Sequence, residues 1–498
     1  MIFVQPILAV GVLALTAYAQ SPVQSPGQAC HGNQLDVYPI PSGMPTKNSF
    51  SINVRSQYGE WYPLGSYLTT LALENTTTGA AAIMDSSMAY FDFCGTVDIA
   101  ITYNGGRVDS SQIRPLSYGI IPQVQGNTIK FTLTEPRNLV IQVNDDIFDC
   151  LHLMTNTIDM DVPSPSDPSV IYFGPGMHNV TSANNTLMVP SNKTVYLAGG
   201  AVLKAGVTFA NVSNSILRGR GILYNVPVGA VLVAYSNNIT VDGVTMLDPP
   251  NGYSLEVGQS DGVVVRNIHS FSSRGNGDGI DLFCTQNILI EGVFMRNSDD
   301  CIALYQSRPG WGFYGNSSNI TIRNSSLWAD IAHPFVAGTH GNTVNPETMT
   351  GVTIQNVDIL DQREMQMWYQ GCIALNAGDL NLLQDFRIED IRVEDIRLGQ
   401  LVNFRVMENP MYNTYPGRGI RDIVVKDLTY TGTHANPSLI LGYDETHLIH
   451  NVTFDNLTVN GLQISSSMEK PSWYLTSDYV PMFANEHVTN LTFNPTTL

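Results

Sequence analysis

Positive charge is scarce in this chain. Its 498 residues include 24 Lys and Arg against 43 Asp and Glu, which gives a net charge of −19 at pH 7. Nucleic acids and anionic membranes bind through clustered Lys and Arg, so we expect neither as a partner. A polyanionic substrate would need a local basic pocket, because the protein as a whole would repel it.

Metal-binding cysteine motifs are also missing. The chain has six cysteines but no Cys-x-x-Cys, which argues against zinc, and we expect no metal or other cofactor. An even number of cysteines is compatible with disulfides in an oxidising compartment, although the sequence leaves their pairing open. The cysteines are Cys30, Cys94, Cys150, Cys284, Cys301 and Cys372.

No apolar run is long enough to cross a membrane. The run from Ile7 to Ala17 instead leads to Ala17-Tyr18-Ala19, an A-x-A site with cleavage expected before Gln20. Residues 1–19 are therefore predicted to be a signal peptide. Twelve N-x-S/T sequons agree with this, and we expect some of them to be glycosylated. The mature protein should be secreted, extracellular and monomeric.

Residues 30–160 have the pattern of antiparallel β-strands. Apolar and polar side chains alternate from Val97 to Tyr103 and from Ile129 to Leu133, so each strand would bury one face. Turn signals separate these runs. The fold class we expect is all-β, with a small antiparallel β-sandwich here. Three prolines within 161–169 forbid helix and disrupt sheet pairing, which predicts a linker.

A short apolar strand repeats through residues 170–498. Copies start at Asn238, Gly262, Asn287, Asn319, Gly351, Asp385, Asp422 and Asn451, at intervals of 24 to 37 residues. Such a unit cannot bury its apolar face alone, so neighbouring units stack into a continuous core. The pattern predicts a right-handed parallel β-helix. The longer intervals imply inserted loops, which build a cleft on one side.

Carboxylates gather where two repeats meet. Asp278 lies 21 residues before Asp299, about one coil, and Asp299 is followed by Asp300. Glycoside hydrolysis needs one carboxylic acid to protonate the leaving oxygen and a second carboxylate to activate water or attack. Close carboxylates resist joint ionisation, which raises at least one pKa, as a general acid requires. Turns of a β-helix also carry purely structural aspartates.

The segments Asn276-Gly277-Asp278-Gly279 and Ser298-Asp299-Asp300, with Gly338-Thr339-His340-Gly341, resemble the catalytic segments of glycoside hydrolase family 28, the polygalacturonases, among the pectin-lyase-like β-helix enzymes. The resemblance implies that Asp299 is the general acid and that Asp278 and Asp300 hold the attacking water, which gives inversion. His340 would tune the acid, with His333 as a rival.

The chain departs from that family in two ways. The Arg-Ile-Lys element that binds galacturonate has no clean counterpart, and Arg405 and Arg418 are weak substitutes. The sandwich-plus-helix layout is similar to glycoside hydrolase family 49, the dextranases and isopullulanases. Its Asp-Gly-x-Glu/Asp element fits Asp278-Gly279-Ile280-Asp281 and makes Asp281 a fourth acidic candidate.

Substrate-binding candidates are Asp281, Arg405 and two aromatic residues of the inserted loops, Trp368 and Tyr369, which could stack on sugars. Trp311 and Phe313 have the same potential, and loop packing explains all four aromatics equally well.

The function we expect is a secreted, inverting hydrolase of a polysaccharide, with a pectic substrate preferred over a neutral α-glucan. A calcium-dependent polysaccharide lyase is an alternative, because carboxylates bind Ca²⁺; Arg274 and Arg296 are the basic residues nearest in sequence. A non-catalytic carbohydrate-binding β-helix is another.

Overall fold

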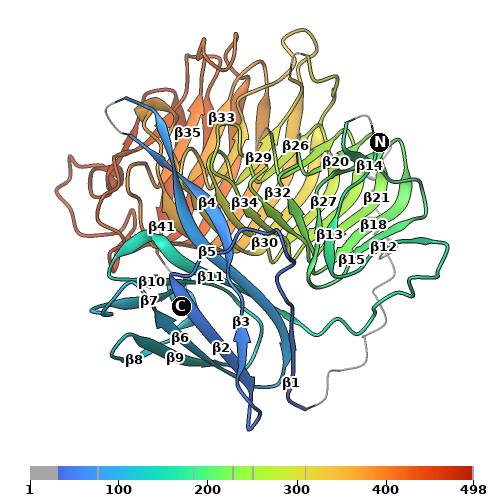
Figure 1. Cartoon of the computed structure of the whole chain (residues 1–498). Coiled ribbons are helices and arrows are strands. Elements are labelled where there is room, and N and C mark those ends of the chain that lie inside the picture. Colours follow the sequence, from blue (N-terminus) through green and yellow to red (C-terminus); the bar gives the residue numbers. More distant parts are fainter. Residues whose placement is uncertain are drawn as a thin grey trace, which may run out of the picture.

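The computed structural model describes residues 32–75, 78–182, 184–226, 229–249, 252–308 and 310–495. The predicted signal peptide lies outside these residues. The described part is almost entirely β-structure (Figure 1), and its helical segments are the 3-10 turns η1 (Leu116–Tyr118), η2 (Met367–Tyr369) and η3 (Thr476–Asp478). It contains no helix long and apolar enough to span a membrane.

The N-terminal part is a β-sandwich. One sheet contains β1 (Gln34–Val37), β4 (Tyr67–Glu74), β5 (Ala81–Cys94), β7 (Ser111–Arg114), β10 (Asn138–Val143) and β11 (Asp146–Thr157). The other contains β2 (Phe50–Ser56), β3 (Tyr62–Leu64), β6 (Val97–Tyr103), β8 (Gln123–Gln125) and β9 (Thr128–Leu133). Pairing is antiparallel except between β5 and β11. Alternating apolar side chains of both sheets form the core, as expected.

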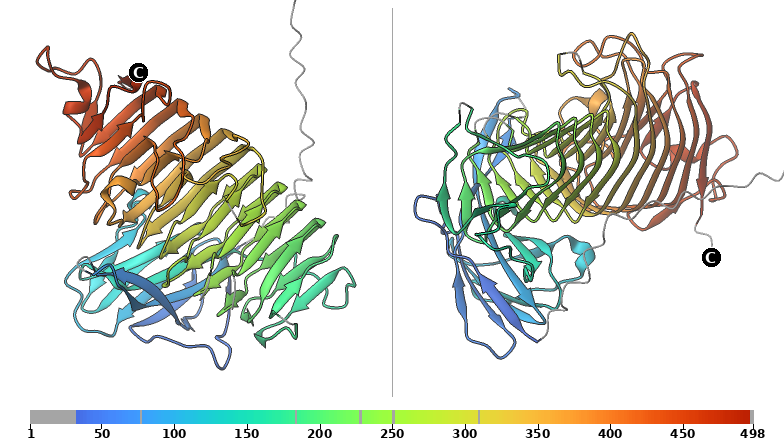
Figure 2. Two further views of the ribbon diagram at one scale, coloured as in Figure 1. Left: turned by 90° about the horizontal axis from the view of Figure 1, so that it is seen from above. Right: turned by 90° about the vertical axis from the view of Figure 1, so that its right-hand side faces the viewer.

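The rest of the chain is a parallel β-helix whose coils stack along one axis (Figure 2). One row of strands forms a sheet of its own: β14 (Thr186–Met188), β17 (Gly206–Ala210), β20 (Val231–Ala234), β23 (Leu255–Gly258), β26 (Ile280–Phe283), β29 (Ile302–Tyr305), β31 (Phe335–Gly338), β33 (Ile373–Ala377), β35 (Val402–Val406), β37 (Ser438–Leu441) and β40 (Met482–Ala484). This eleven-stranded sheet is called the cleft sheet below.

Two further rows close the coils. The first contains β12 (Val170–Phe173), β15 (Thr194–Leu197), β18 (Ser213–Gly219), β21 (Asn237–Asp242), β24 (Asp261–Arg266) and β27 (Gln286–Glu291). The second contains β13 (Gly176–His178), β16 (Ala201–Leu203), β19 (Ile222–Tyr224), β22 (Thr245–Leu247), β25 (His269–Phe271) and β28 (Phe294–Asn297).

Long strands then join the two rows into one sheet. They are β30 (Ser317–Ala329), β32 (Thr348–Gln362), β34 (Leu382–Val393), β36 (Gly419–Tyr430) and β38 (Ile449–Val459), after which β39 (Leu462–Ile464) and β41 (Val488–Asn494) end the sheet. Both β27 and β28 pair with β30. The expected all-β architecture, a parallel β-helix after a sandwich, is confirmed.

The repeated Asn, Asp or Gly at the start of each unit has a backbone reason. Asn238, Asn287 and Asn319 have φ angles of 52°, 55° and 55°, and Gly262 in the same position has 67°. This left-handed conformation favours Gly and Asn. The asparagine side chains also form a ladder, since Nδ2 of Asn319 donates to Oδ1 of Asn287 at 2.6 Å. The repeat is therefore set by turns as well as by buried strands.

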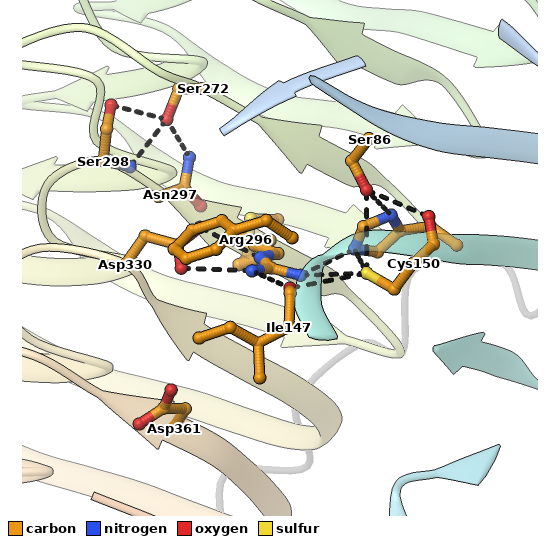
Figure 3. A network of polar contacts seen from close by, with 12 residues as sticks. Ser86, Ile147, Cys150, Ser272, Arg296, Asn297, Ser298, Asp330 and Asp361 are labelled. Atoms are coloured by element: carbon orange, nitrogen blue, oxygen red, sulfur yellow. Dashed lines mark hydrogen bonds and ion pairs between the residues drawn. The ribbon is translucent and has the colours of Figure 1, made fainter. Parts of the chain in front are cut away.

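The sandwich packs on the second row of the helix, centred on Arg296. This side chain is wholly buried and donates to Asp330 at 2.9 and 3.2 Å, to His152 at 3.2 Å and to the carbonyl of Ile147 at 2.7 Å (Figure 3). Its guanidinium also lies 3.8 Å from the centre of the Trp328 ring. Arg296 thus ties the two parts together, and it lies on β28 of the second row rather than on the cleft sheet.

One of the described cysteines forms a disulfide, and four are free. Cys94 is disulfide-bonded, whereas Cys150, Cys284, Cys301 and Cys372 are buried free thiols. The described coils are therefore held together by packing and ladder hydrogen bonds.

Candidate active site

The three predicted carboxylates meet on the cleft sheet. Asp278 precedes β26, and Asp299 and Asp300 precede β29, which pairs in register with β26. One oxygen from each of Asp278, Asp299 and Asp300 lies within 4.8 Å of the others. The 21-residue spacing therefore places the side chains on neighbouring coils, as the sequence predicted.

The two turns are fixed to each other across the coils. Nδ2 of Asn297 donates to Oγ of Ser272 at 3.0 Å and to the carbonyl of Gly277 at 3.1 Å (Figure 3). The Ser298 amide also donates to Ser272. Gly279 allows the close approach, since a Cβ there would lie 2.3 Å from the Cys301 carbonyl oxygen. The backbone under the carboxylates is thereby held rigidly.

Asp300 is held by three donors. The Tyr305 hydroxyl donates to Oδ2 at 2.8 Å, and the backbone amide and Nδ1 of His333 contact Oδ1 at 3.1 and 2.7 Å. On its other side, Nε2 of His333 lies 2.6 Å from the carbonyl oxygen of Tyr369. A carboxylate fixed in this way suits a group that orients a water molecule.

Asp299 is the partly exposed member of the cluster. Burial, followed by the charge of Asp300, raises the pKa of Asp299 to about 7. The Asp300 amide donates to Oδ1 of Asp299 at 3.1 Å and the charge of His333 opposes the increase. A carboxyl group that keeps its proton near neutrality and reaches solvent is a suitable general acid.

Acidic side chains continue along the sheet from the cluster. Asp281 is wholly buried, and neither carboxylate oxygen has a hydrogen-bond partner among the described residues. Burial, then the charge of Asp300, raises its pKa well above the usual value. Glu256 lies opposite Asp281 on β23, and burial raises its pKa to about 7. Burial and Asp281 likewise raise the pKa of Asp278.

The histidine in contact with the carboxylates is His333, whereas the sequence favoured His340. The His340 ring packs against Tyr305 with centroids 5.1 Å apart. Burial, then the charge of Arg308, lowers the pKa of His340 to about 3, so this ring is neutral. The inserted loops, whose lengths the repeat does not specify, place the earlier histidine at the turn before β31.

The predicted substrate-binding residues separate into two groups. Trp368 is 59% exposed, and Arg405 lies 5.5 Å from its ring centre while donating to its carbonyl. Tyr369 is buried, stacks on Tyr412 at 4.4 Å and meets His333 edge-on at 4.6 Å. Trp368 is available for stacking, whereas Tyr369 supports His333.

The other candidates pack within the protein. Trp311 stacks on Phe283 and Tyr253, at 5.1 and 5.4 Å, and Phe313 is buried beside Phe283. Arg418 donates to the backbone carbonyls of Leu380 and Glu347, which precede it by 38 and 71 residues. Its guanidinium therefore binds neighbouring segments of the protein.

Sequence reasoning missed Tyr305, Glu256 and Arg308. Glu256 lies 25 residues before Asp281, and Tyr305 ends the strand that follows the aspartate pair, so a coil-by-coil register would have found both. Arg308 belongs to an inserted loop and has no such signal. Its charge lowers the pKa of both Asp281 and Glu256.

The clustered carboxylates could also hold a hard cation, since Asp278, Asp299 and Asp300 offer oxygens close together. The described set has an acid with a pKa raised to about 7, Asp299, beside a carboxylate fixed by three donors, Asp300, and such a pair suits glycoside hydrolysis. The fold and the cluster together define a β-helical glycoside hydrolase.

The particular family follows from comparison with known proteins. Residues 207–475 match the model of glycosyl hydrolases family 28, and the chain belongs to this family. It is 28% identical over 147 residues to a polygalacturonase of Chamaecyparis obtusa, covering 28% of this chain and 26% of that protein. It is 24% identical over 223 residues to an isopullulanase of Aspergillus niger, covering 39% and 36%.

The chain thus matches only about a quarter to a third of the length of these relatives. The similarity in fold extends over much more of the chain than the similarity in sequence. Dex49A from Penicillium minioluteum superposes with a TM-score of 0.59 at 12% identity, over 92% of this chain and 96% of that one. The family-49-like layout of sandwich and helix is therefore confirmed.

Proposed function

We propose that this enzyme hydrolyses a neutral α-glucan with Asp299 as general acid. Asp299 would protonate the glycosidic oxygen, while Asp278 and Asp300 together would hold the attacking water. The observation that carries this assignment is the position of a partly exposed carboxyl group, with a pKa of about 7, beside a carboxylate fixed by three donors.

Inversion is proposed for the stereochemistry. Inverting pairs usually have carboxyl groups roughly 6.5–9.5 Å apart, whereas oxygens of this cluster lie within 4.8 Å. The short distance is compatible with inversion if Asp278 and Asp300 together hold the water at the edge of the cluster. The water then does not have to fit between one acid and one base. Proton NMR of the first product formed would show the inverted anomer; a retained anomer would contradict the water assignment.

The charges around the carboxylate cluster support a neutral substrate. A pectic chain carries a carboxylate on each galacturonate and needs cations beside it. Arg405 and Arg308 keep their charge, since each donates to a neutral group, the Trp368 carbonyl and, at 3.1 Å, the Tyr253 hydroxyl, but the acidic side chains around the cluster outnumber them. The sheet beside the cluster carries Glu256 and Asp281. The alignment with isopullulanase is also longer than that with polygalacturonase.

A pectic substrate, which the sequence favoured, is the second candidate. Membership of family 28 and the position of Arg308 near Asp281 support it. Release of reducing ends from dextran, pullulan, polygalacturonate and rhamnogalacturonan separates the two. We expect activity on the glucans, and activity on polygalacturonate alone would overturn this substrate.

The catalytic assignment is tested with Asp299→Asn and Asp300→Asn. We expect each to lower kcat by about 10²–10⁴-fold, whereas Asp109→Asn, a change at an exposed ion pair with Arg107, should have no effect. Full activity of both variants would refute the assignment. A chelator should leave activity unchanged and the product should lack ultraviolet absorption, since a calcium-dependent lyase would give the opposite results.

We also propose that the protein is secreted as a monomer after removal of residues 1–19, with residues 161–169 linking sandwich and helix. The A-x-A site and the sequons support secretion. N-terminal sequencing of extracellular protein should begin at Gln20, and light scattering should give the monomer mass.

A further inference from the structure

We propose that a groove on the solvent-facing side of the sandwich binds a polysaccharide chain, as a second carbohydrate site. The ligand class rests on the proposed function. The groove has a volume of about 620 Å³, and its lining includes Arg55, Trp61, Asp98, Tyr118 and Lys130. This volume is in the range of sites that bind small ligands or short chain segments.

The floor of the groove is a row of polar side chains across three paired strands. Arg55, Asp98 and Thr132 are opposite one another on β2, β6 and β9. Nε of Arg55 and the hydroxyl of Thr132 donate to Asp98 at 3.0 and 2.9 Å. These contacts hold the row in place before any ligand arrives, so sugar hydroxyls would meet ordered donors and acceptors.

Lys130 adds an unused donor to this floor. It is exposed, lies on β9 two residues before Thr132, and is paired with Gln123 of β8. With the described residues it makes no ion pair or side-chain hydrogen bond. Its three ammonium protons are therefore available to ligand hydroxyls.

Two aromatic rings line the groove, each braced by an arginine. The guanidinium of Arg55 lies 4.5 Å from the centre of the Trp61 ring, and that of Arg137 lies 4.3 Å from the centre of Tyr118. Trp61 is 41% exposed. Pyranose rings present apolar C–H faces that pack on aromatic rings, while their hydroxyls need polar partners. Braced rings beside a polar floor match both requirements.

Charge favours a carbohydrate over a polyanion or a charged peptide. Arg55 is paired with Asp98 and Arg137 with Glu135, so most of the groove's charge is neutralised within it. An extended peptide would pair with a sheet edge, whereas this groove lies across a sheet face.

The groove is far from the catalytic carboxylates. Strands β2, β6, β8 and β9 lie in the lower part of the view in Figure 1, and β26 and β29 of the cleft sheet lie above its middle. One short oligosaccharide cannot occupy both sites. The groove would instead keep the enzyme on a long or particulate polysaccharide and raise the local substrate concentration.

The experiment measures retardation of the full-length protein in native gels containing dextran or pullulan. Asp299→Asn is used as the parent, so that the gel polysaccharide is not hydrolysed. We expect Trp61→Ala to weaken the affinity about tenfold, and Lys130→Ala, at an exposed side chain that should not affect folding, to weaken it about threefold. Trp473→Ala is the matched control, because Trp473 is a 78% exposed tryptophan outside the groove.

Equal retardation of the Trp61, Lys130 and parent proteins, or no retardation of the parent, would overturn the inference. With Asp299 intact, Trp61→Ala should hydrolyse short oligosaccharides normally and long chains with a higher KM. If wild-type enzyme cleaves no glucan but retardation still depends on Trp61, the proposed function fails and the groove stands.

Discussion

His333 is fixed between Asp300 and the backbone of Tyr369, with its two ring nitrogens 2.7 and 2.6 Å from their oxygens. A carbonyl oxygen only accepts, so Nε2 carries a proton and Nδ1 shares a second one with Asp300. Burial by itself would lower the pKa of His333, but the charge and hydrogen bond of Asp300 raise it. The imidazole therefore brings positive charge close to Asp299.

His333→Asn should lower kcat at least tenfold, because Asp300 loses a donor and its fixed orientation. The positive charge that lowers the pKa of Asp299 also disappears, so the alkaline limb of the kcat/KM profile should move to higher pH. The pH profile separates this role from simple loss of structure. His450→Asn, at an exposed side chain bonded to Thr489, is the control and should leave the profile unchanged.

Activity of the wild-type enzyme should fall as pH rises through about 7. The general acid works only while protonated, and the pKa of Asp299 is about 7. The measurement is kcat/KM from pH 4 to 9 on the best substrate of the panel. A profile that is flat through this range would exclude Asp299 as the acid.

Tyr305→Phe should lower kcat about tenfold with little change in KM. The variant keeps the packing against Phe283 and His340 but removes the hydroxyl that donates to Asp300 at 2.8 Å. Tyr443→Phe removes an exposed hydroxyl bonded to Glu408 and should have wild-type kinetics. Tyr305 acts through Asp300, so an increase in KM with unchanged kcat would contradict this role.

Glu256→Gln should stabilise the protein at pH 8 more than at pH 4.5. The folded-state pKa of Glu256 is raised to about 7 from 4.5, so folding favours its protonated form. Stability from this group is fully present below about pH 4.5 and is lost as pH rises through 7. Thermal melting at both pH values checks this, and an equal shift at both would contradict it.

Arg296→Met should lower the free energy of unfolding by about 3–5 kcal/mol, because the buried charge of Asp330 loses a partner. Asp330 keeps Arg397 at 2.9 Å, which favours the lower end of this range. Arg323→Met breaks a partly exposed pair with Glu291 and should cost below about 1 kcal/mol. Denaturant melts of both variants provide the comparison, and equal losses would show that the buried contact has no special role.

Much of the fold could be predicted because the turns and strands of each coil restrict which residues can occupy their positions. Asn287 and Asn319 start repeats since each turn needs a left-handed residue, and buried positions alternate with exposed ones along each strand. The meeting of Asp278 with Asp299 followed from this register. Glu256 obeys the same register and could have been found in the same way.

The choice between His333 and His340 could not be made from the sequence. Both follow the aspartate pair in a segment whose loops differ in length from coil to coil, and the contact of His333 with Asp300 depends on how that segment folds back. The roles of Tyr369 and Trp311 are similar cases. Each is an aromatic residue in a loop, and only packing shows that it supports protein side chains.

The sequence by itself therefore determined the coils, the turns between them and the meeting of carboxylates from two neighbouring coils, because these depend on local conformation and a regular repeat. The tertiary structure decided which histidine holds Asp300, which arginines are already engaged, and that Arg296 contacts the sandwich. Those features depend on contacts between segments far apart in the chain, which no local pattern specifies.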